Sequence, residues 1–362
     1  MANNPTSNEE WSSLIKVLVV EDSPTVREFL IYLLASDPGI QVVGTATNGE
    51  EALAAVKSKR PDIVTMDIHM PKMNGLEATR AIMENCPVPI VIVTGSSSAA
   101  EMESTLSALE SGALAVMKRP MGIGHPQHTV TVREFIQTVK LMSEVKVVRR
   151  WSKRSKPFPV IASSSIPQTI IPLAEIQLVA IGSSTGGPLV LQQILSALPR
   201  NFPIPIILVQ HIAEGFTETF AQWLMQTTDF PVSMAGHDVF MQPGHAYVAP
   251  NSYQTTVDGI GRIRLTKGDP ATGHCPSVSC LFHSVAEAYG AHAAGVLLTG
   301  MGKDGAMELG LMKKKGAVTI AQDKESSVVH GMPGEAVALG AATFVLAPDQ
   351  IAAALASLAR PS

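Results

Sequence analysis

The stretch LVAIGSSTGGP at residues 178–188 sets an apolar run directly before a glycine-rich turn and a proline. Short apolar runs are typical of buried strands, and proline is favoured in the first turn of a helix. The stretch therefore predicts a strand, a tight turn and a helix, which together form the repeating unit of a parallel α/β sheet.

The alternation of strands and helices continues on the C-terminal side of this stretch. Further apolar runs predict strands of the same sheet; they occupy residues 204–210, 294–299 and 317–321. Shorter runs between them indicate antiparallel strands; they occupy residues 246–249, 254–258 and 262–266. Asp258-Gly259 supplies a hairpin turn between the last two. We therefore expect a doubly wound, mainly parallel α/β sheet with an antiparallel edge hairpin.

The N-terminal half alternates in the same way. Its apolar runs lie at residues 16–20, 62–66, 90–94 and 114–117. Helical patterns lie between them, for example at residues 25–34 and 49–57. Alternating strands and helices predict a second parallel sheet with helices on both faces.

Residues 147–175 separate the two halves. The segment carries five Lys and Arg residues, four prolines and a run of three serines, which is typical of a linker. Its cations could also form a nucleic-acid or membrane patch, but the segment lacks helical periodicity, and a solvated linker is the preferred interpretation. We expect domains at residues 14–146 and 176–358.

Composition narrows the function classes. The chain has 362 residues, of which 46% are hydrophobic and 16% charged, so we expect a soluble protein of about two domains. A net charge of −4 argues against nucleic acid as a partner. Three cysteines indicate a reducing compartment, and no apolar run reaches the roughly 18 residues that span a bilayer. We expect a cytoplasmic chain without membrane insertion.

Carboxylates follow the predicted strands of the N-terminal half. Glu21-Asp22 follows the first strand and Asp67 the third, while Thr94 and Lys118 end the next two. In a doubly wound sheet these ends meet at one edge. Single acids there are often helix N-caps, but three together repel one another unless a divalent cation such as Mg²⁺ lies among them. Asp67 would then accept a phosphoryl group, with Thr94 and Lys118 binding the new charge.

This half resembles the receiver domain of response regulators, a flavodoxin-like (βα)5 fold, over about residues 14–145. The shared residues are VEDS at 20–23, MDIHMP at 66–71, Gly75 and KRP at 118–120. The resemblance implies a histidine kinase as phosphodonor, and Mg²⁺ held by Glu21, Asp22, Asp67 and the His69 carbonyl. Glu21 stands where the family usually has Asp, and Arg119 intervenes before Pro120.

The glycine-rich turn of the C-terminal half predicts a nucleophile. Gly182 and Gly186 fit the Gly-x-Ser-x-Gly pattern, which exposes a serine hydroxyl at a helix N-terminus. Ser184 is the candidate and Ser183 the adjacent competitor. Such turns also cradle phosphates, so a nucleotide-binding site is an equal alternative from this motif alone.

A serine nucleophile needs a base and an orienting acid. His211 directly follows the strand at 204–210, and Asp304 follows the strand at 294–299, so all three would share one sheet edge. The usual α/β-hydrolase order would instead nominate His330 as base, but no clear strand precedes it. We favour His211.

Two further patterns offer alternatives. GMGKDG at 300–305 formally fits the dinucleotide fingerprint, but this interpretation gives Ser184 and His211 no role. His274, Cys275, Cys280 and His283 lie close enough in sequence to suggest zinc, yet their spacing lacks a Cys-x-x-Cys pair. Small buried thiols are the preferred explanation, and we expect no cofactor in this domain.

The C-terminal half resembles the catalytic domain of chemotaxis protein-glutamate methylesterases, the CheB family, over about residues 176–356. The shared segments are AIGSSTGG at 180–187, VQH at 209–211, AP at 249–250, PSV at 276–278, LTGMGKDGA at 298–306 and GMP at 331–333. A receiver joined to this domain is the family's architecture. The resemblance implies Ser184, His211 and Asp304 as catalytic residues and the Met301 N–H as oxyanion donor. The family more often has Asp at Ser279 and a basic residue at Gly334.

The resemblance also implies the activity. Ser184 would attack glutamate γ-methyl esters of methyl-accepting chemotaxis receptors, releasing methanol, and glutamine deamidation is expected beside it. We expect phosphorylation of Asp67 to relieve a receiver that covers the catalytic residues. The alternative is a phosphorylation-dependent adaptor that only binds receptors.

Overall fold

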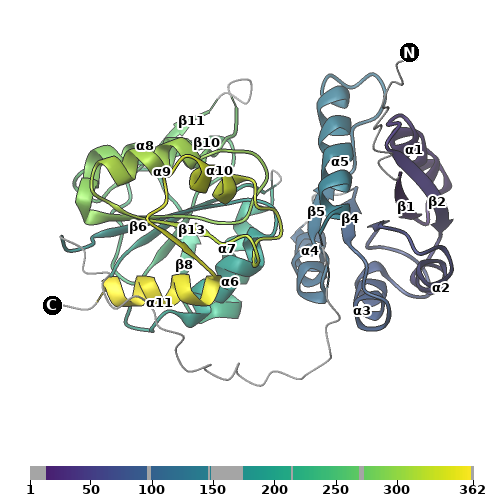
Figure 1. The fold of residues 1–362 in the computed structure, drawn as a ribbon, viewed down its shortest axis with the longest axis horizontal. Coiled ribbons are helices and arrows are strands. Elements are labelled where there is room, and N and C mark those ends of the chain that lie inside the picture. Colours follow the sequence, from purple (N-terminus) through teal and green to yellow (C-terminus); the bar gives the residue numbers. More distant parts are fainter. Residues whose placement is uncertain are drawn as a thin grey trace, which may run out of the picture. The chain divides into compact units, whose positions relative to one another are not determined.

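The computed structural model describes residues 14–95, 99–145, 147, 174–212, 215–268 and 273–359. The chain divides into two compact units, and each contains its own parallel sheet (Figure 1). Apart from Val147, Ala174 and Glu175, the predicted linker lies outside the described residues. The predicted limits of the two domains therefore stay predictions.

The first unit contains a five-stranded parallel sheet in the order β2-β1-β3-β4-β5. In chain order the elements from the first strand to the fifth helix are β1 (Ile15–Val20), α1 (Pro24–Ala35), β2 (Ile40–Ala46), α2 (Gly49–Lys59), β3 (Ile63–Met66), α3 (Gly75–Asn85), β4 (Ile90–Thr94), α4 (Ala99–Ser111), β5 (Ala115–Lys118) and α5 (His128–Ser143). Residues 99–110 of α4 group with the second unit. The (βα)5 prediction is confirmed.

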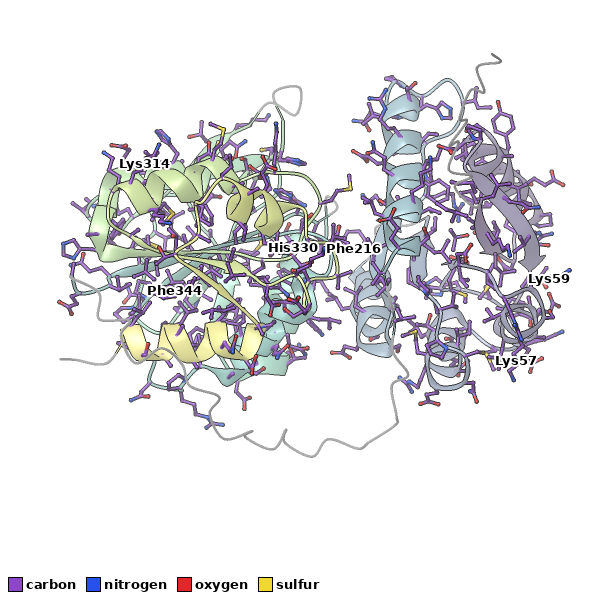
Figure 2. All side chains as sticks on the ribbon, viewed as in Figure 1. Lys57, Lys59, Phe216, Lys314, His330 and Phe344 are labelled. Carbon is purple, nitrogen blue, oxygen red and sulfur yellow. The ribbon has the colours of Figure 1, made fainter. Side chains whose placement is uncertain are left out.

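The local sequence explains these elements. All residues of β3 and β4 are buried, as expected of strands covered on both faces. Helix α2 begins at Asn48, whose side chain accepts a hydrogen bond from the N–H of Glu51, and it ends with Lys57 and Lys59 beside its negative dipole end (Figure 2). Helix α1 contacts α5, and α2 contacts α3, with the sheet between the two pairs (Figure 1). Because β1 lies between β2 and β3, the winding reverses there and the carboxyl ends of β1 and β3 are neighbours, the place where ligands bind in such sheets.

The second unit contains a seven-stranded sheet in the order β14-β13-β12-β6-β7-β9-β8. Its strands are β6 (Leu178–Ser183), β7 (Ile206–Gln210), β8 (Val232–Met234), β9 (Ala246–Val248), β12 (Ala293–Leu297), β13 (Val318–Gln322) and β14 (Phe344–Leu346). Its helices are α6 (Gly187–Ala197), α7 (Thr217–Thr228), α8 (Val278–Tyr289), the 3-10 turn η2 (Gly290–His292), α9 (Ala306–Lys314), α10 (Met332–Ala338) and α11 (Pro348–Leu358). Helices α8, α9 and α10 cover one face, and α6 and α11 pack together on the other (Figure 1).

One strand prediction was wrong in direction. Ala246–Val248 pairs in parallel with both β7 and β8, and all three of its residues are buried inside the main sheet. So short a run carries no signal for strand direction, and its burial resembles that of its parallel neighbours. The predicted hairpin is confirmed as β10 (Tyr253–Val257) and β11 (Ile263–Lys267), which form a separate two-stranded antiparallel sheet. Asp258 supports its turn by accepting from the N–H groups of Ile260 and Arg262.

Strand β6 lies at the centre of the second sheet. It pairs with β12 on one side and β7 on the other, so that Gly182 is opposite Leu297 and Ser183 is opposite Gln210. The carboxyl ends of these three strands are therefore neighbours, and the winding reverses at β6. This edge is where the predicted catalytic residues follow their strands.

Candidate active site

The two adjacent serines in the turn after β6 differ in their burial and hydrogen bonds. Ser183 is fully buried, and its hydroxyl donates a 2.7 Å hydrogen bond to Oε1 of Gln210. Ser184 is half-buried, and its backbone N–H donates to the Thr299 carbonyl at 3.0 Å. Gly186 has a left-handed φ of 79°, a conformation that favours glycine and that leads directly into α6. Of the two serines, Ser184 is the one that is partly exposed.

A buried glutamine ties this turn to the neighbouring loop. Gln210, the last residue of β7, is 2% exposed. Its side-chain nitrogen donates to the carbonyls of Ser184 and His211, each at 2.8 Å. One side chain thus fixes the backbone at two predicted catalytic positions. The sequence analysis missed Gln210, although a polar residue that closes an apolar run directly before a candidate histidine was a usable signal.

His211 and Asp304 are in direct contact. Nε2 of His211 lies 2.9 Å from Oδ2 of Asp304, and the two side chains are 13% and 8% exposed. The N–H of His211 also donates to the Ser183 carbonyl at 3.0 Å. The structure therefore brings these two predicted residues together at the strand edge where Ser184 lies.

The start of α8 surrounds the Asp304 carboxylate with donors. The Val278 N–H donates to Oδ2 at 2.8 Å, and the Ser277 hydroxyl and Ser279 N–H donate to Oδ1 at 2.9 and 3.0 Å. Burial alone would raise the pKa of Asp304, but the hydrogen bond from His211 and those from Ser279 hold it well below its usual value. The helix dipole of α8 favours the same ionised form. Asp304 is therefore an ionised acceptor at neutral pH.

His330, the alternative base, contacts a different group. Its Nδ1 lies 3.3 Å from the Ser327 hydroxyl, and a Cβ on Gly334 would lie 2.8 Å from its Cδ2 (Figure 2). Burial lowers its pKa. Of the two histidines, His211 is the one whose ring contacts an acid, so the geometry favours His211 as base.

Gly300 lies against the predicted nucleophile. Its carbonyl accepts from the N–H groups of Gly331 and Met332, and a Cβ on Gly300 would lie 2.7 Å from Cβ of Ser184. Met301, the next residue, is half-buried. Its backbone is thus close to Ser184, and its role as oxyanion donor stays a prediction.

The ring of His274 stacks on that of His211. Their centroids are 4.4 Å apart and their planes differ by 17°. Burial, followed by the charge of His211, lowers the pKa of His274. Within the described residues, the donors of His274, Cys275, Cys280 and His283 do not converge as metal ligands do. The stacking was not predicted, because the sequence places His274 in a loop 63 residues from His211 (274 − 211 = 63).

In the first unit, the three acids predicted to meet at the sheet edge lie close together. Ligand oxygens of Glu21, Asp22 and Asp67 lie within 4.8 Å of one another. Burial, then the charge of Asp67, raises the pKa of Glu21 to about 7; burial also raises that of Asp67. Oε2 of Glu21 is buried without a hydrogen-bond partner among the described residues. Clustered carboxylates with an unsatisfied oxygen fit a hard divalent cation such as Mg²⁺.

The remaining predicted residues lie around this cluster. Thr94, 2% exposed, ends β4, and His69 is exposed two residues beyond Asp67. Lys118 ends β5 opposite Thr94. Arg119 is a cation beside Glu21: its Nη2 lies 3.8 Å from Oε2 of that residue. The roles of Thr94, Lys118 and the His69 carbonyl stay predictions.

Two family models match this chain, one in each half of the sequence. Residues 17–130 match the response regulator receiver domain model, and residues 179–355 match the CheB methylesterase model. Two relatives are named protein-glutamate methylesterase/protein-glutamine glutaminase. The one from Nitrosospira multiformis is 56% identical, over 95% of this chain and 97% of its own, and the one from Geobacter metallireducens is 55% identical, over 96% and 99%. The Thermotoga maritima CheB methylesterase catalytic domain is 38% identical, covers 51% of this chain and 100% of its own, and has a TM-score of 0.49.

The fold and the two sites define a response regulator whose receiver is followed by a serine-hydrolase-like α/β domain. The identity over nearly the whole chain is specific enough to name the family. The chain belongs to the protein-glutamate methylesterases/protein-glutamine glutaminases of the CheB family, and it is a carboxylic ester hydrolase. Among the helices described, none has the length and hydropathy needed to cross a bilayer.

Proposed function

We propose that the chain hydrolyses glutamate γ-methyl esters on methyl-accepting chemotaxis receptors with Ser184, His211 and Asp304, and that phosphorylation of Asp67 activates it. The observation that carries the catalytic part is the 2.9 Å contact between His211 and Asp304 beside the turn that holds Ser184. The acidic cluster around Asp67 supports the regulatory part.

In the proposed reaction, Oγ of Ser184 attacks the γ-carbonyl carbon of the ester. His211 takes the hydroxyl proton and passes it to the departing methoxide, which leaves as methanol. Because Nε2 of His211 faces Asp304, its Nδ1 is the nitrogen available to accept the proton. Water then attacks the acyl-enzyme, with His211 again taking a proton, and the receptor carboxylic acid and free Ser184 are formed.

The negative oxygen of each tetrahedral intermediate needs donors. The Met301 N–H follows Gly300, which lies against Ser184, and is the proposed donor. A preorganised donor of this kind contributes about 3–4 kcal/mol in comparable sites. Attack on a glutamine side chain would follow the same course with ammonia as the leaving group.

In the receiver, an oxygen of Asp67 would attack the phosphorus of a phosphohistidine on the kinase. The phosphorus–nitrogen bond breaks as the phosphorus–oxygen bond forms, and the kinase histidine takes up a proton. Glu21, Asp22, Asp67 and the His69 carbonyl would hold Mg²⁺, which supplies charge neutralisation for the phosphoryl oxygens. We propose a cytoplasmic location, where kinase and receptor tails meet.

The test is methanol release from methylated receptor membranes by the full chain, with and without acetyl phosphate. We expect Ser184→Ala to abolish release, and Ser183→Ala, the matched control, to retain it. Asp67→Asn should remove the response to acetyl phosphate but keep the basal rate. Undiminished release by Ser184→Ala would remove that serine from the mechanism. An adaptor would give no release and no labelling by a fluorophosphonate.

A further inference from the structure

Helix α9 begins directly after Asp304 without a capping side chain of its own. The residue that flanks its start, the N-cap, is Gly305, which has a left-handed φ of 82° and no side chain to accept a hydrogen bond. A Cβ on Gly305 would overlap Val278 and lie 3.3 Å from Cδ1 of Leu297, so neither a serine nor an asparagine fits there. The start of α9 therefore needs a capping group from elsewhere in the chain.

Ser279 of α8 supplies that group. Its hydroxyl oxygen accepts the Gly305 N–H at 2.9 Å, and the hydroxyl donates to Oε2 of Glu308 at 2.6 Å. Glu308 is the third residue of α9, the position from which a glutamate usually accepts the N-cap N–H directly. Because the Ser279 hydroxyl lies between these two groups, the capping box of α9 is closed through a side chain of α8.

The same serine contacts the carboxylate of Asp304. The Ser279 N–H donates to Oδ1 of Asp304 at 3.0 Å, beside the donors from Ser277 and Val278. Ser279 is thus bonded both to the Asp304 side chain and to the N–H of the residue that follows it. How this turn is held against α8 decides where the carboxylate lies relative to His211.

Glu308 fixes the direction of the Ser279 hydroxyl. A serine hydroxyl carries one proton and rotates to suit its surroundings. The Glu308 oxygen takes that proton at 2.6 Å, a length typical of charge-assisted hydrogen bonds, and this leaves the lone pairs of the hydroxyl for the Gly305 N–H. Both side chains are half-buried, which limits competition from water. Without Glu308 the hydroxyl can turn, and the Gly305 N–H then loses its acceptor.

We propose that Ser279 and Glu308 are positioning residues for Asp304: the capping box they close holds the Asp304 turn against α8 and keeps its carboxylate facing His211. This inference rests on the proposed role of Asp304 as orienting acid. Since both residues act through Asp304, their loss should lower kcat and leave KM unchanged.

The experiment measures kcat and KM for methanol release from methylated receptor membranes by the full chain. A displacement on the order of 1 Å at a reacting group costs about 10²-fold in rate, and a loosened turn that keeps its carboxylate costs less, so Glu308→Leu should lower kcat about tenfold. Glu308→Gln, which keeps an acceptor oxygen for the Ser279 hydroxyl, should lose less than Glu308→Leu.

Gln350→Leu is the matched control. Gln350 is the third residue of α11 and accepts the N-cap N–H of Ala347 at 3.1 Å, in a helix on the opposite face of the sheet from α9 (Figure 1). Each leucine variant removes one capping acceptor, so both should lower Tm. We expect a lower kcat from Glu308→Leu and a normal kcat from Gln350→Leu.

A double variant tests whether the two residues act together. Once Ser279→Ala removes the hydroxyl, the Glu308 carboxylate is no longer connected to Gly305. In that background Glu308→Leu should change kcat by less than about twofold. Effects of the two substitutions that multiply would overturn the connection through Ser279.

The outcomes separate this inference from the proposed function. A wild-type chain that releases no methanol, or a Ser184→Ala variant that releases it normally, would overturn the proposed mechanism itself. An active, Ser184-dependent wild type whose kcat is unchanged in Glu308→Leu, or falls equally in Glu308→Leu and Gln350→Leu, would overturn the positioning role. Circular dichroism establishes that each variant is folded. If Glu308→Leu fails to fold, Ser279→Ala gives the same test, with a similar loss of kcat expected.

Discussion

Nε2 of His211 lies 2.9 Å from Oδ2 of Asp304, although the two residues are 93 positions apart in the chain. The contact orients the imidazole through Nε2, so Nδ1 is the ring nitrogen that the proposed mechanism uses. The carboxylate is itself held by three donors from the start of α8. His211, the proposed base, is therefore oriented by a chain of contacts that continues through Asp304 to the start of α8.

Replacing Asp304 by Asn should lower kcat by about 10³–10⁴-fold, because an amide can present its N–H to His211 and stabilise the wrong tautomer. The measurement is methanol release at saturating methylated receptor. Ser277→Ala is the matched control, since it removes one donor to Asp304 and leaves the carboxylate. A kcat for Asp304→Asn within tenfold of wild type would contradict the assigned role.

The lowered pKa of Asp304 also predicts that the stability of the folded chain depends on pH. The folded chain holds its pKa below the ordinary 3.8, so the ionised carboxylate stabilises the fold above about pH 4, and this contribution is lost as the pH falls through the folded pKa. We expect Asp304→Asn to lower the free energy of unfolding by about 3 kcal/mol at pH 7. Urea titrations should give the same difference at pH 5 and a smaller one at pH 3.5. A difference that already closes between pH 7 and pH 5 would point to another group.

Gln210→Leu should impair both stability and catalysis. It removes the 2.7 Å partner of the Ser183 hydroxyl and one donor to each of the Ser184 and His211 carbonyls, of which the Ser184 carbonyl keeps the Gly187 N–H. A buried group left without a partner costs about 1–3 kcal/mol. Gln322→Leu is a matched control, because Gln322 is also buried at a strand end but bonds to Thr299 and Ser326 instead. We expect similar losses of Tm from the two variants and a larger fall in kcat from Gln210→Leu. Equal kcat values would argue against a positioning role.

Sequence alone located residues that lie at the ends of strong strands or in the loops that follow them. Ser184, His211 and Asp304 each come after an apolar run, so the topology of a parallel sheet was enough to place them at one edge. The partners of those residues were not predictable in this way. Ser277 and His274 reach the site from the segment before α8, and their contacts depend on how that helix packs against the sheet.

The end of β5 shows a second limit of prediction from sequence. Strand ends are uncertain by a residue or two, and a shift of one residue exchanges the side chain that faces the site for one that faces away. Lys118 and Arg119 are both cations, so the sequence could not distinguish them. The 3.8 Å contact between Arg119 and Glu21 depends on how the chain packs, and so does the position of the Arg119 guanidinium beside Gly95, which has no Cβ. The sequence alone does not show either.

His274 should act on catalysis through His211. The stacked ring restricts rotation of the imidazole, so we expect His274→Ala to lower kcat several-fold, and His274→Phe, which keeps a flat ring, to lose less. The measurement is methanol release at saturating methylated receptor. Equal losses in the two variants would show that stacking is not the reason.

The close approach of Gly300 to Ser184 predicts that catalysis is sensitive to a displacement of this serine, the proposed nucleophile. A Cβ there would lie nearest to Sδ of Met332, the far end of a flexible side chain that can shift, and 2.7 Å from Cβ of Ser184, which is held on a short turn and cannot yield in that way. Gly300→Ala should therefore fold but lower kcat by about 10²-fold, the effect of a displacement on the order of 1 Å at a reacting group. Gly122→Ala is the control, since no atom lies within 4 Å of its added Cβ. The measurements are methanol release and labelling by a fluorophosphonate, which should fall together because both need the Ser184 hydroxyl in place. Normal labelling with slow methanol release would instead indicate that the substitution disturbs Met301, the proposed oxyanion donor and the next residue in the chain.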